Sequence, residues 1–106
     1  MNYYLSIISH LHSDIIINNK NLLKISKLDN VNVCIKDNYG EPSLRKYCET
    51  NNFDFINEDK GLGFGENNNY IFSFFLKKYQ TESDDIFIVI NPDIEIDLNN
   101  FIKLQE

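Results

Sequence analysis

Four short apolar runs, separated by segments with helical patterning, constrain the fold more than any other feature of this sequence. The runs cover residues 3–9, 31–35, 53–56 and 85–90, and they are rich in the β-branched and aromatic side chains that favour buried strands. Strands and helices alternate along the chain, and this order builds right-handed crossovers and a parallel sheet with helices on both faces. The sequence therefore predicts an α/β fold in which the first strand lies inside the sheet.

Helices are expected between these strands. They are expected over residues 14–28, 42–50 and 66–79, with a short final helix over 98–104. Asp14 can cap the first of them, and Pro42 suits the first turn of the second. The inward stripe of the first helix is expected to consist of Ile15, Leu22, Leu23 and Ile25.

Size and charge limit the functions that this chain can have. Its 106 residues, 42% of them apolar, can bury one compact core, so a single domain is expected. A formal net charge of -6 argues against a nucleic-acid partner, because such binding depends on clustered Lys and Arg. No apolar run approaches the roughly 20 residues that span a bilayer, and no signal peptide is evident, so a cytoplasmic protein without a membrane span is expected.

Cysteine usage agrees with that compartment. Cys34 lies in a strand-like run and Cys48 in a helical pattern, without the spacing of a metal or redox motif. Two buried or half-buried free thiols are expected, and a disulfide is the less favoured alternative, because a reducing compartment disfavours it.

Polar residues follow each apolar run, where a parallel sheet binds its ligands. His10, Asp37, Asn57 and Asp93 stand at the four strand ends, which are expected to face one crevice. Hard divalent cations take one or two carboxylates together with phosphate oxygens, which makes Asp93 a candidate ligand for Mg²⁺ or Mn²⁺. The alternative is that such acids only cap loops or the following helix.

Three other features admit a functional and a structural interpretation. The Gly61, Gly63 and Gly65 series follows the third strand, whereas a dinucleotide fingerprint follows the first, and it lacks the Gly-Lys-Ser/Thr ending of a Walker loop. The alternative that these glycines only form a loop leading into a helix remains open. His10 and His12 suit zinc by residue type, but without a third ligand at sensible spacing, loop or pocket histidines are favoured. The third helix carries an aromatic cluster, Phe72, Phe74, Phe75 and Tyr79. This cluster could face a membrane surface, but packing of the helix on the sheet is the favoured interpretation.

Three motifs in fixed order carry a family resemblance. They are Asp37-Asn38-Tyr39-Gly40, the segment from Gly63 to Asn69, and Ile90-Asn91-Pro92-Asp93. With them, the sequence resembles family 2 glycosyltransferases, especially the rhamnosyltransferase-like branch, from the first strand to about Asp97.

The resemblance implies a GT-A fold with a Rossmann-like nucleotide-binding half. It also implies inverting, metal-assisted transfer of a hexosyl or rhamnosyl group from a UDP- or dTDP-linked sugar to a glycan or lipid-linked acceptor in polysaccharide biosynthesis. By position, it implies that Asp37 binds the base, that Asn91 lies near the ribose and that Asp93 binds the metal. The remaining donor-side residues that it implies are Ser9 and His10, through backbone atoms, and Gly63, Asn68 and Asn69.

No residue matches the catalytic base of that family. We therefore expect residues 1–106 to be the N-terminal donor-binding part of a longer enzyme, working in the cytoplasm at the inner face of the membrane, with peripheral association left open. The first strand ends in Ser9-His10-Leu11 where the branch carries Thr-Tyr-Asn. This departure motivates the alternative of a non-catalytic nucleotide-binding or interaction module derived from a glycosyltransferase.

Overall fold

A four-stranded parallel sheet forms the centre of the computed structural model, which describes residues 1–58, 63–93, 99 and 101. The strand order is β3-β2-β1-β4, so β1 lies inside the sheet, as expected. The strands are β1 (Tyr3–Ser9), β2 (Val31–Asp37), β3 (Asp54–Asn57) and β4 (Ile86–Ile90). They match the predicted runs to within about two residues at each end.

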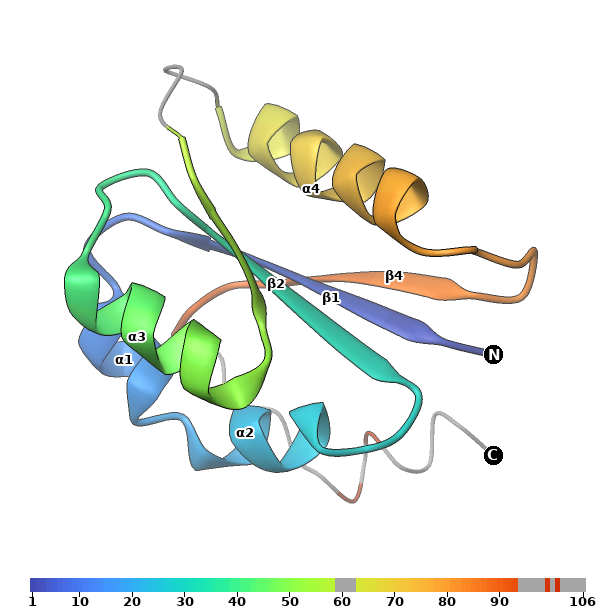
Figure 1. Cartoon of the computed structure of the whole chain (residues 1–106), viewed down its shortest axis with the longest axis horizontal. Coiled ribbons are helices and arrows are strands. Elements are labelled where there is room, and N and C mark those ends of the chain that lie inside the picture. Colours follow the sequence, from blue (N-terminus) through green and yellow to red (C-terminus); the bar gives the residue numbers. More distant parts are fainter. Residues whose placement is uncertain (59–62, 94–98, 100, 102–106) are drawn as a thin grey trace.

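Helices cover both faces of the sheet, which confirms the predicted α/β class (Figure 1). One face is covered by α4 (Phe64–Lys78), and the other carries α1 (Ser13–Ile17), α2 (Lys20–Ser26) and α3 (Pro42–Asn51). The predicted helices 42–50 and 66–79 correspond to α3 and α4. No helix in the described part of the chain is long and apolar enough to cross a membrane.

The alternation of side chains along β1 divides the core into two layers. Tyr3, Leu5 and Ile7 pack with the residues of α1, α2 and α3, while Tyr4 and Ile8 pack with α4. All seven residues of β1 are buried. A strand covered on both faces has no solvent-facing polar positions, and this explains why the sequence shows a continuous apolar run there.

The first helix is divided in two, contrary to the expectation of one continuous helix. The side chain of Asn19 accepts a 3.0 Å hydrogen bond from the backbone N–H of Leu22 and so caps a new helix, α2. Asn18 donates to the backbone carbonyl of Asp14 and ends α1. The predicted cap was also wrong, since Asp14 lies inside the first turn and His12 holds the N-cap position. Asn side chains compete for backbone partners in this way, which favours helix ends over helix interiors.

This division changes which residue of α1 points inward. Ile16 is 1% exposed and joins the core, whereas Ile15, expected in the inward stripe, is 46% exposed. In α2 the expectation is confirmed, since Leu22 and Ile25 are buried and Leu23 is partly buried against them.

The aromatic cluster of α4 packs mainly on the sheet. Phe75 is buried, and Phe74 and Tyr79 are partly buried against the same cluster. Phe72 is 43% exposed, and its ring centroid lies 5.1 Å from that of Phe87 on β4. Packing on the sheet is therefore confirmed for three of the four aromatics.

Both cysteines are free and buried, as expected. The predicted final helix, 98–104, lies largely outside the described residues. Of it, Asn99 and Phe101 are described and both are helical. Phe101 is buried, with its ring centroid 5.2 Å from that of Tyr3.

Candidate functional site

The carboxyl ends of the strands form a common edge. Register places Ser9 of β1 beside Asp37 of β2, and Asp37 beside Asn57 of β3. On the other side of β1, Ile7 pairs with Ile90, so the Asn91-Pro92-Asp93 segment leaves β4 at the same edge. The predicted strand-end residues therefore lie along one side of the sheet.

A cavity of about 410 Å³ opens beyond the ends of β1 and β4. Its walls come from the ends of these strands, from α1 and from the first turns of α4, and its lining residues are Ile8, His10, His12, Ile15, Phe64, Asn67, Asn91, Pro92 and Asp93. Apolar walls with a few polar groups, in a cavity of this size, are typical of small-molecule sites. The cavity thus brings together three of the predicted site residues, His10, Asn91 and Asp93.

Asn91 and Asp93 lie on the exposed rim of this cavity, on either side of Pro92. The proline ring restricts the backbone between them and limits the positions that the two side chains can take. The described residues contain no group of three or more His, Cys, Asp or Glu that could hold a metal ion by themselves. Protein atoms alone therefore do not form a closed metal cage in this part of the chain.

Asp37 is fully buried, and both of its carboxylate oxygens have backbone partners. Oδ1 accepts from the N–H of Tyr39 at 2.8 Å and Oδ2 from the N–H of Glu41 at 2.7 Å. These bonds shape the loop that follows β2. The Glu41 side chain in turn accepts from the hydroxyl of Ser13 at 2.7 Å, which ties this loop to α1. In this structure, then, Asp37 organises the loop, and it is not among the residues that line the cavity.

The three consecutive asparagines of α4 point in three directions. Asn67 is buried and lines the cavity, and its Oδ1 accepts from Nζ of Lys36 at 2.7 Å. Asn68 is buried against β1, where its Oδ1 accepts from the hydroxyl of Ser6 at 2.7 Å. Asn69 is exposed on the outer side of α4. The resemblance assigned Asn68 and Asn69 to the donor side, and of the three asparagines it is Asn67 that lines the cavity.

Ser9 and Gly63 complete the predicted set, and neither lines the cavity. The hydroxyl oxygen of Ser9 accepts a 3.2 Å hydrogen bond from the backbone N–H of His12, within the turn between β1 and α1. Gly63 holds the N-cap position of α4 with φ −74°, and a Cβ added there would have no heavy atom within 4 Å. The local backbone therefore does not require glycine at this position.

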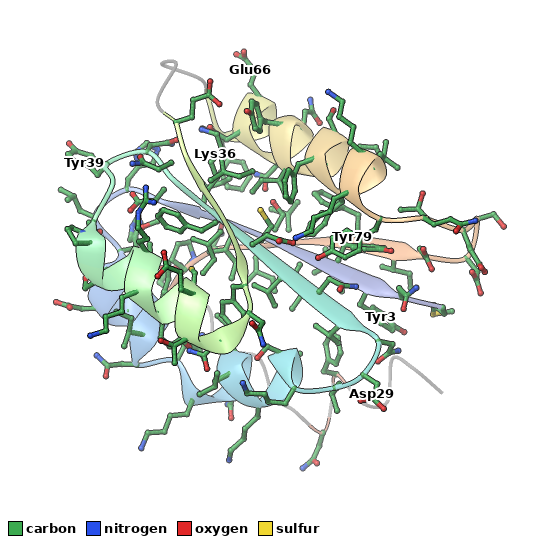
Figure 2. All side chains as sticks on the ribbon, in the orientation of Figure 1. Tyr3, Asp29, Lys36, Tyr39, Glu66 and Tyr79 are labelled. Atoms are coloured by element: carbon green, nitrogen blue, oxygen red, sulfur yellow. The ribbon has the colours of Figure 1, made fainter. Side chains whose placement is uncertain are left out.

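Lys36 is the principal site feature that the sequence prediction missed. It is 1% exposed, and Figure 2 shows it at the edge of the sheet where β2 and β3 approach the start of α4. Its Nζ donates to Oδ1 of Asn38 at 2.6 Å, to the backbone carbonyl of Glu58 at 2.6 Å and to Asn67. Alternation along β2 is the signal that could have located it, because Lys36 shares a strand face with Cys34, which packs under α4.

A larger hollow of about 580 Å³ lies elsewhere on the molecule. The described residues that line it all belong to α4 and include Asn69, Tyr70 and Lys77. Among the described residues, no strand end reaches this hollow, so the smaller cavity at the carboxyl ends of the strands is the better candidate site.

The parallel sheet and its helical layers define a Rossmann-like α/β fold, with a cavity at the carboxyl ends of the strands, where such sheets bind their ligands. The chain is similar to the rhamnosyltransferase WbbL of Escherichia coli (strain K12), with 33% identity over 109 residues. The alignment covers 97% of this chain and 40% of WbbL, so the chain spans less than half the length of that relative. No protein-family model matches the chain, and no solved structure matches it. The chain is thus related to a glycosyltransferase over nearly all of its own length.

Proposed function

We propose that this chain is the donor-binding part of a glycosyltransferase and that it binds a nucleoside-diphosphate sugar in the cavity at the ends of β1 and β4. One observation carries the proposal. In a chain related to a glycosyltransferase, the cavity brings His10, Asn91 and Asp93 together at the edge where parallel sheets bind nucleotides.

The lining of the cavity suits such a ligand. Ile8, Ile15 and Phe64 supply apolar surface against which a ring can pack. Asn91 and the two histidines supply hydrogen-bonding groups for hydroxyl, carbonyl or phosphate oxygens. The ligand class is therefore small, partly apolar and rich in acceptor oxygens, which fits a nucleoside diphosphate.

A divalent cation, Mg²⁺ or Mn²⁺, belongs to this proposal, with Asp93 as its protein ligand. The carboxylate of Asp93 and the amide oxygen of Asn91 are hard donors on one rim, and such cations complete their shells with phosphate oxygens and water. The donor set therefore fits a metal that binds together with the nucleotide. When bound, the metal would offset negative charge on the departing diphosphate. The chain's own contribution is to bind the metal ion and the nucleotide at the carboxyl ends of the strands.

The transfer of a sugar is part of the same proposal, supported by the relation to a rhamnosyltransferase. Its inverting course and the glycan or lipid-linked acceptor belong to the proposal through the three sequence motifs. No residue among those described is assigned the role of the base that deprotonates the acceptor hydroxyl. The proposal for this chain is accordingly donor binding, which can be measured without transfer.

Titration calorimetry of the folded chain with UDP and dTDP, with and without Mn²⁺, tests the proposal. Binding of at least one of these nucleotides, strengthened by Mn²⁺, is the expected result, and GDP and ADP serve as comparison ligands. Absence of heat with all four, for protein whose circular dichroism shows the folded state, would contradict donor binding. Binding that is equal with and without Mn²⁺ would remove the metal from the proposal.

A further inference from the structure

A chain of hydrogen bonds connects a buried lysine to the rim of the cavity. Nζ of Lys36 lies 2.6 Å from Oδ1 of Asn38, and Nδ2 of Asn38 lies 3.0 Å from Nε2 of His10. Lys36 and Asn38 are both buried, whereas His10 is exposed and lines the cavity. The hydrogen bonding of His10, at the rim, is thus linked through Asn38 to the buried ammonium group of Lys36.

The chemistry of lysine determines how the Asn38 amide is oriented. An ammonium group has three donors and no acceptor, so the Asn38 atom that faces Nζ is the oxygen. The NH₂ group of Asn38 then faces His10, and it can only donate. Nε2 of His10 must therefore accept, which places the ring proton of neutral His10 on Nδ1.

His12 is held in the opposite tautomer. Its Nδ1 accepts a 2.8 Å hydrogen bond from the backbone N–H of His10, so its ring proton lies on Nε2. Both histidines line the cavity, while Asn38 does not. In each ring, the nitrogen engaged by the protein is the one without a proton, and the other nitrogen carries an N–H.

We propose that Lys36 is a positioning residue that, through Asn38, fixes His10 as the Nδ1–H tautomer, so that His10 and His12 both offer ring N–H donors to acceptor oxygens of the ligand. The identity of that ligand, a nucleoside diphosphate, rests on the proposed function, whereas the tautomer does not. Neutral donors of fixed direction suit carbonyl or phosphate oxygens and select against ligand groups that are themselves donors.

Nuclear magnetic resonance of the imidazole nitrogens tests the first part without any ligand. The chain has only two histidines, so His10→Gln and His12→Gln variants assign both rings. At alkaline pH, where the rings are neutral, ¹⁵N shifts and two-bond couplings distinguish the protonated nitrogen from the unprotonated one. The expected result is Nδ1–H for His10 and Nε2–H for His12. A predominantly Nε2–H ring at His10 in the parent would overturn the proposal.

Two substitutions then test the role of the Lys36–Asn38 pair. In Asn38→Asp the side chain offers oxygens to both neighbours, so it still pairs with Lys36 but now accepts from His10, which should change to Nε2–H. In Lys36→Met the Asn38 amide is released, and His10 should become a mixture of tautomers. Lys46→Met, an exposed position on α3, is the matched control and should leave both rings unchanged. His12, fixed by a backbone group, is the internal reference in every variant.

Lys36→Met leaves buried oxygens without their donor and can lower stability, so Asn38→Asp decides the question if that variant does not fold. An unchanged His10 tautomer in folded Asn38→Asp would overturn the proposal, whatever the nucleotide titrations show.

A double-mutant cycle with UDP or dTDP, whichever binds the parent better, tests the ligand-facing part. Lys36→Met should weaken binding by about fivefold, the range expected for one hydrogen bond, and should have little further effect in the His10→Ala background. Equal losses in both backgrounds would show that Lys36 does not act through His10. If none of the four nucleoside diphosphates binds the parent, the proposed function fails, while the tautomer measurement still decides whether Lys36 positions His10.

Discussion

The hydroxyl of Ser6, in the interior of β1, donates a 2.7 Å hydrogen bond to Oδ1 of Asn68 in the first turns of α4. Both side chains are buried, and Nδ2 of Asn68 donates to the backbone carbonyl of Phe64. This pair fixes the start of α4 on the sheet, directly beside the cavity that Phe64 and Asn67 line.

Asn68→Ala should therefore reduce stability. The substitution leaves the Ser6 hydroxyl buried without its acceptor, and the free energy of unfolding should fall by about 2 kcal/mol. Asn69→Ala, one residue further along the same helix but exposed, is the matched control and should change it by less than about 0.5 kcal/mol. Urea denaturation of the two variants measures the difference. Equal effects would mean that the Ser6–Asn68 bond does not stabilise the fold.

Asp93→Asn should weaken metal-dependent nucleotide binding without affecting the fold. The amide keeps the size of the side chain but removes the charge that a hard cation requires, so affinity in Mn²⁺ should fall at least about tenfold, roughly 1.4 kcal/mol. Affinity without metal should change less. Asp84→Asn, at the other end of β4 and also exposed, is the control and should bind like the parent. Parent-like affinity of Asp93→Asn in Mn²⁺ would exclude Asp93 as the metal ligand.

Asp37→Asn separates the structural role of this residue from a role in base recognition. Both carboxylate oxygens accept backbone N–H groups, and an amide can satisfy only one of them, so unfolding free energy should drop by about 1–3 kcal/mol. Asp29→Asn, an exposed position at the far end of the sheet from the Tyr39 loop, should have little effect (Figure 2). If Asp37 reads the base, the variant will also change the preference between UDP and GDP. If the preference between UDP and GDP is unchanged while the stability is lower, the role of Asp37 is limited to organising the loop after β2.

Gly40→Ala should be strongly destabilising for a backbone reason. Gly40 has φ +80°, and a Cβ there would lie 2.8 Å from Nδ2 of Asn57. The left-handed conformation and this contact together should cost about 2 kcal/mol, measured by thermal or urea unfolding. Gly65→Ala is the control, because a Cβ there meets nothing within 4 Å and helices favour alanine. Equal stabilities of the two variants would contradict the strain assigned to Gly40.

The buried thiols should make the protein less stable at alkaline pH. Burial, followed by the nearby Asp37, raises the pKa of Cys48 to about 12, and burial with Asp54 raises the pKa of Cys34 well above its usual range. In an unfolded chain these thiols lose their protons near their ordinary pKa of 9.0, so above that pH the folded state binds more protons than the unfolded state. The stabilising contribution is complete below about pH 9 and is lost as the pH rises, by up to about 1.4 kcal/mol per pH unit for each thiol.

Urea unfolding between neutral pH and about pH 10 measures this slope. The double variant Cys34→Ala/Cys48→Ala should show a shallower decline, although its stability at neutral pH is lower. A decline as steep as that of the parent would assign the alkaline loss to other groups, of which Tyr79 is the first candidate, because burial and its hydrogen bond to Asp54 also raise its pKa.

The strands could be predicted closely because each is a short, mainly apolar run that polar residues follow, and in β1 this run reflects burial on both faces. The break between α1 and α2 was missed, since Asn19 can cap a helix or sit within one, and only the bond to Leu22 decides between them. The orientation of α4 about its own axis could not be predicted either, and this affected the site. The motif identified the asparagine run, but which member faces the cavity depends on how α4 docks on Ser6 and Lys36, which sequence spacing does not reveal.

The position of β1 has a consequence for how this chain folds. β1 pairs with β2, which follows it closely, but its other neighbour is β4, and the bond from Asn2 N–H to the Asp85 carboxylate joins residues 83 positions apart. Closing so long a loop is slow, because its entropy must be lost before the pairing is gained. During synthesis, one side of β1 stays unpaired until residues 86–90 have emerged, so among the described strands the cavity at the ends of β1 and β4 is the last part of the carboxyl edge to form.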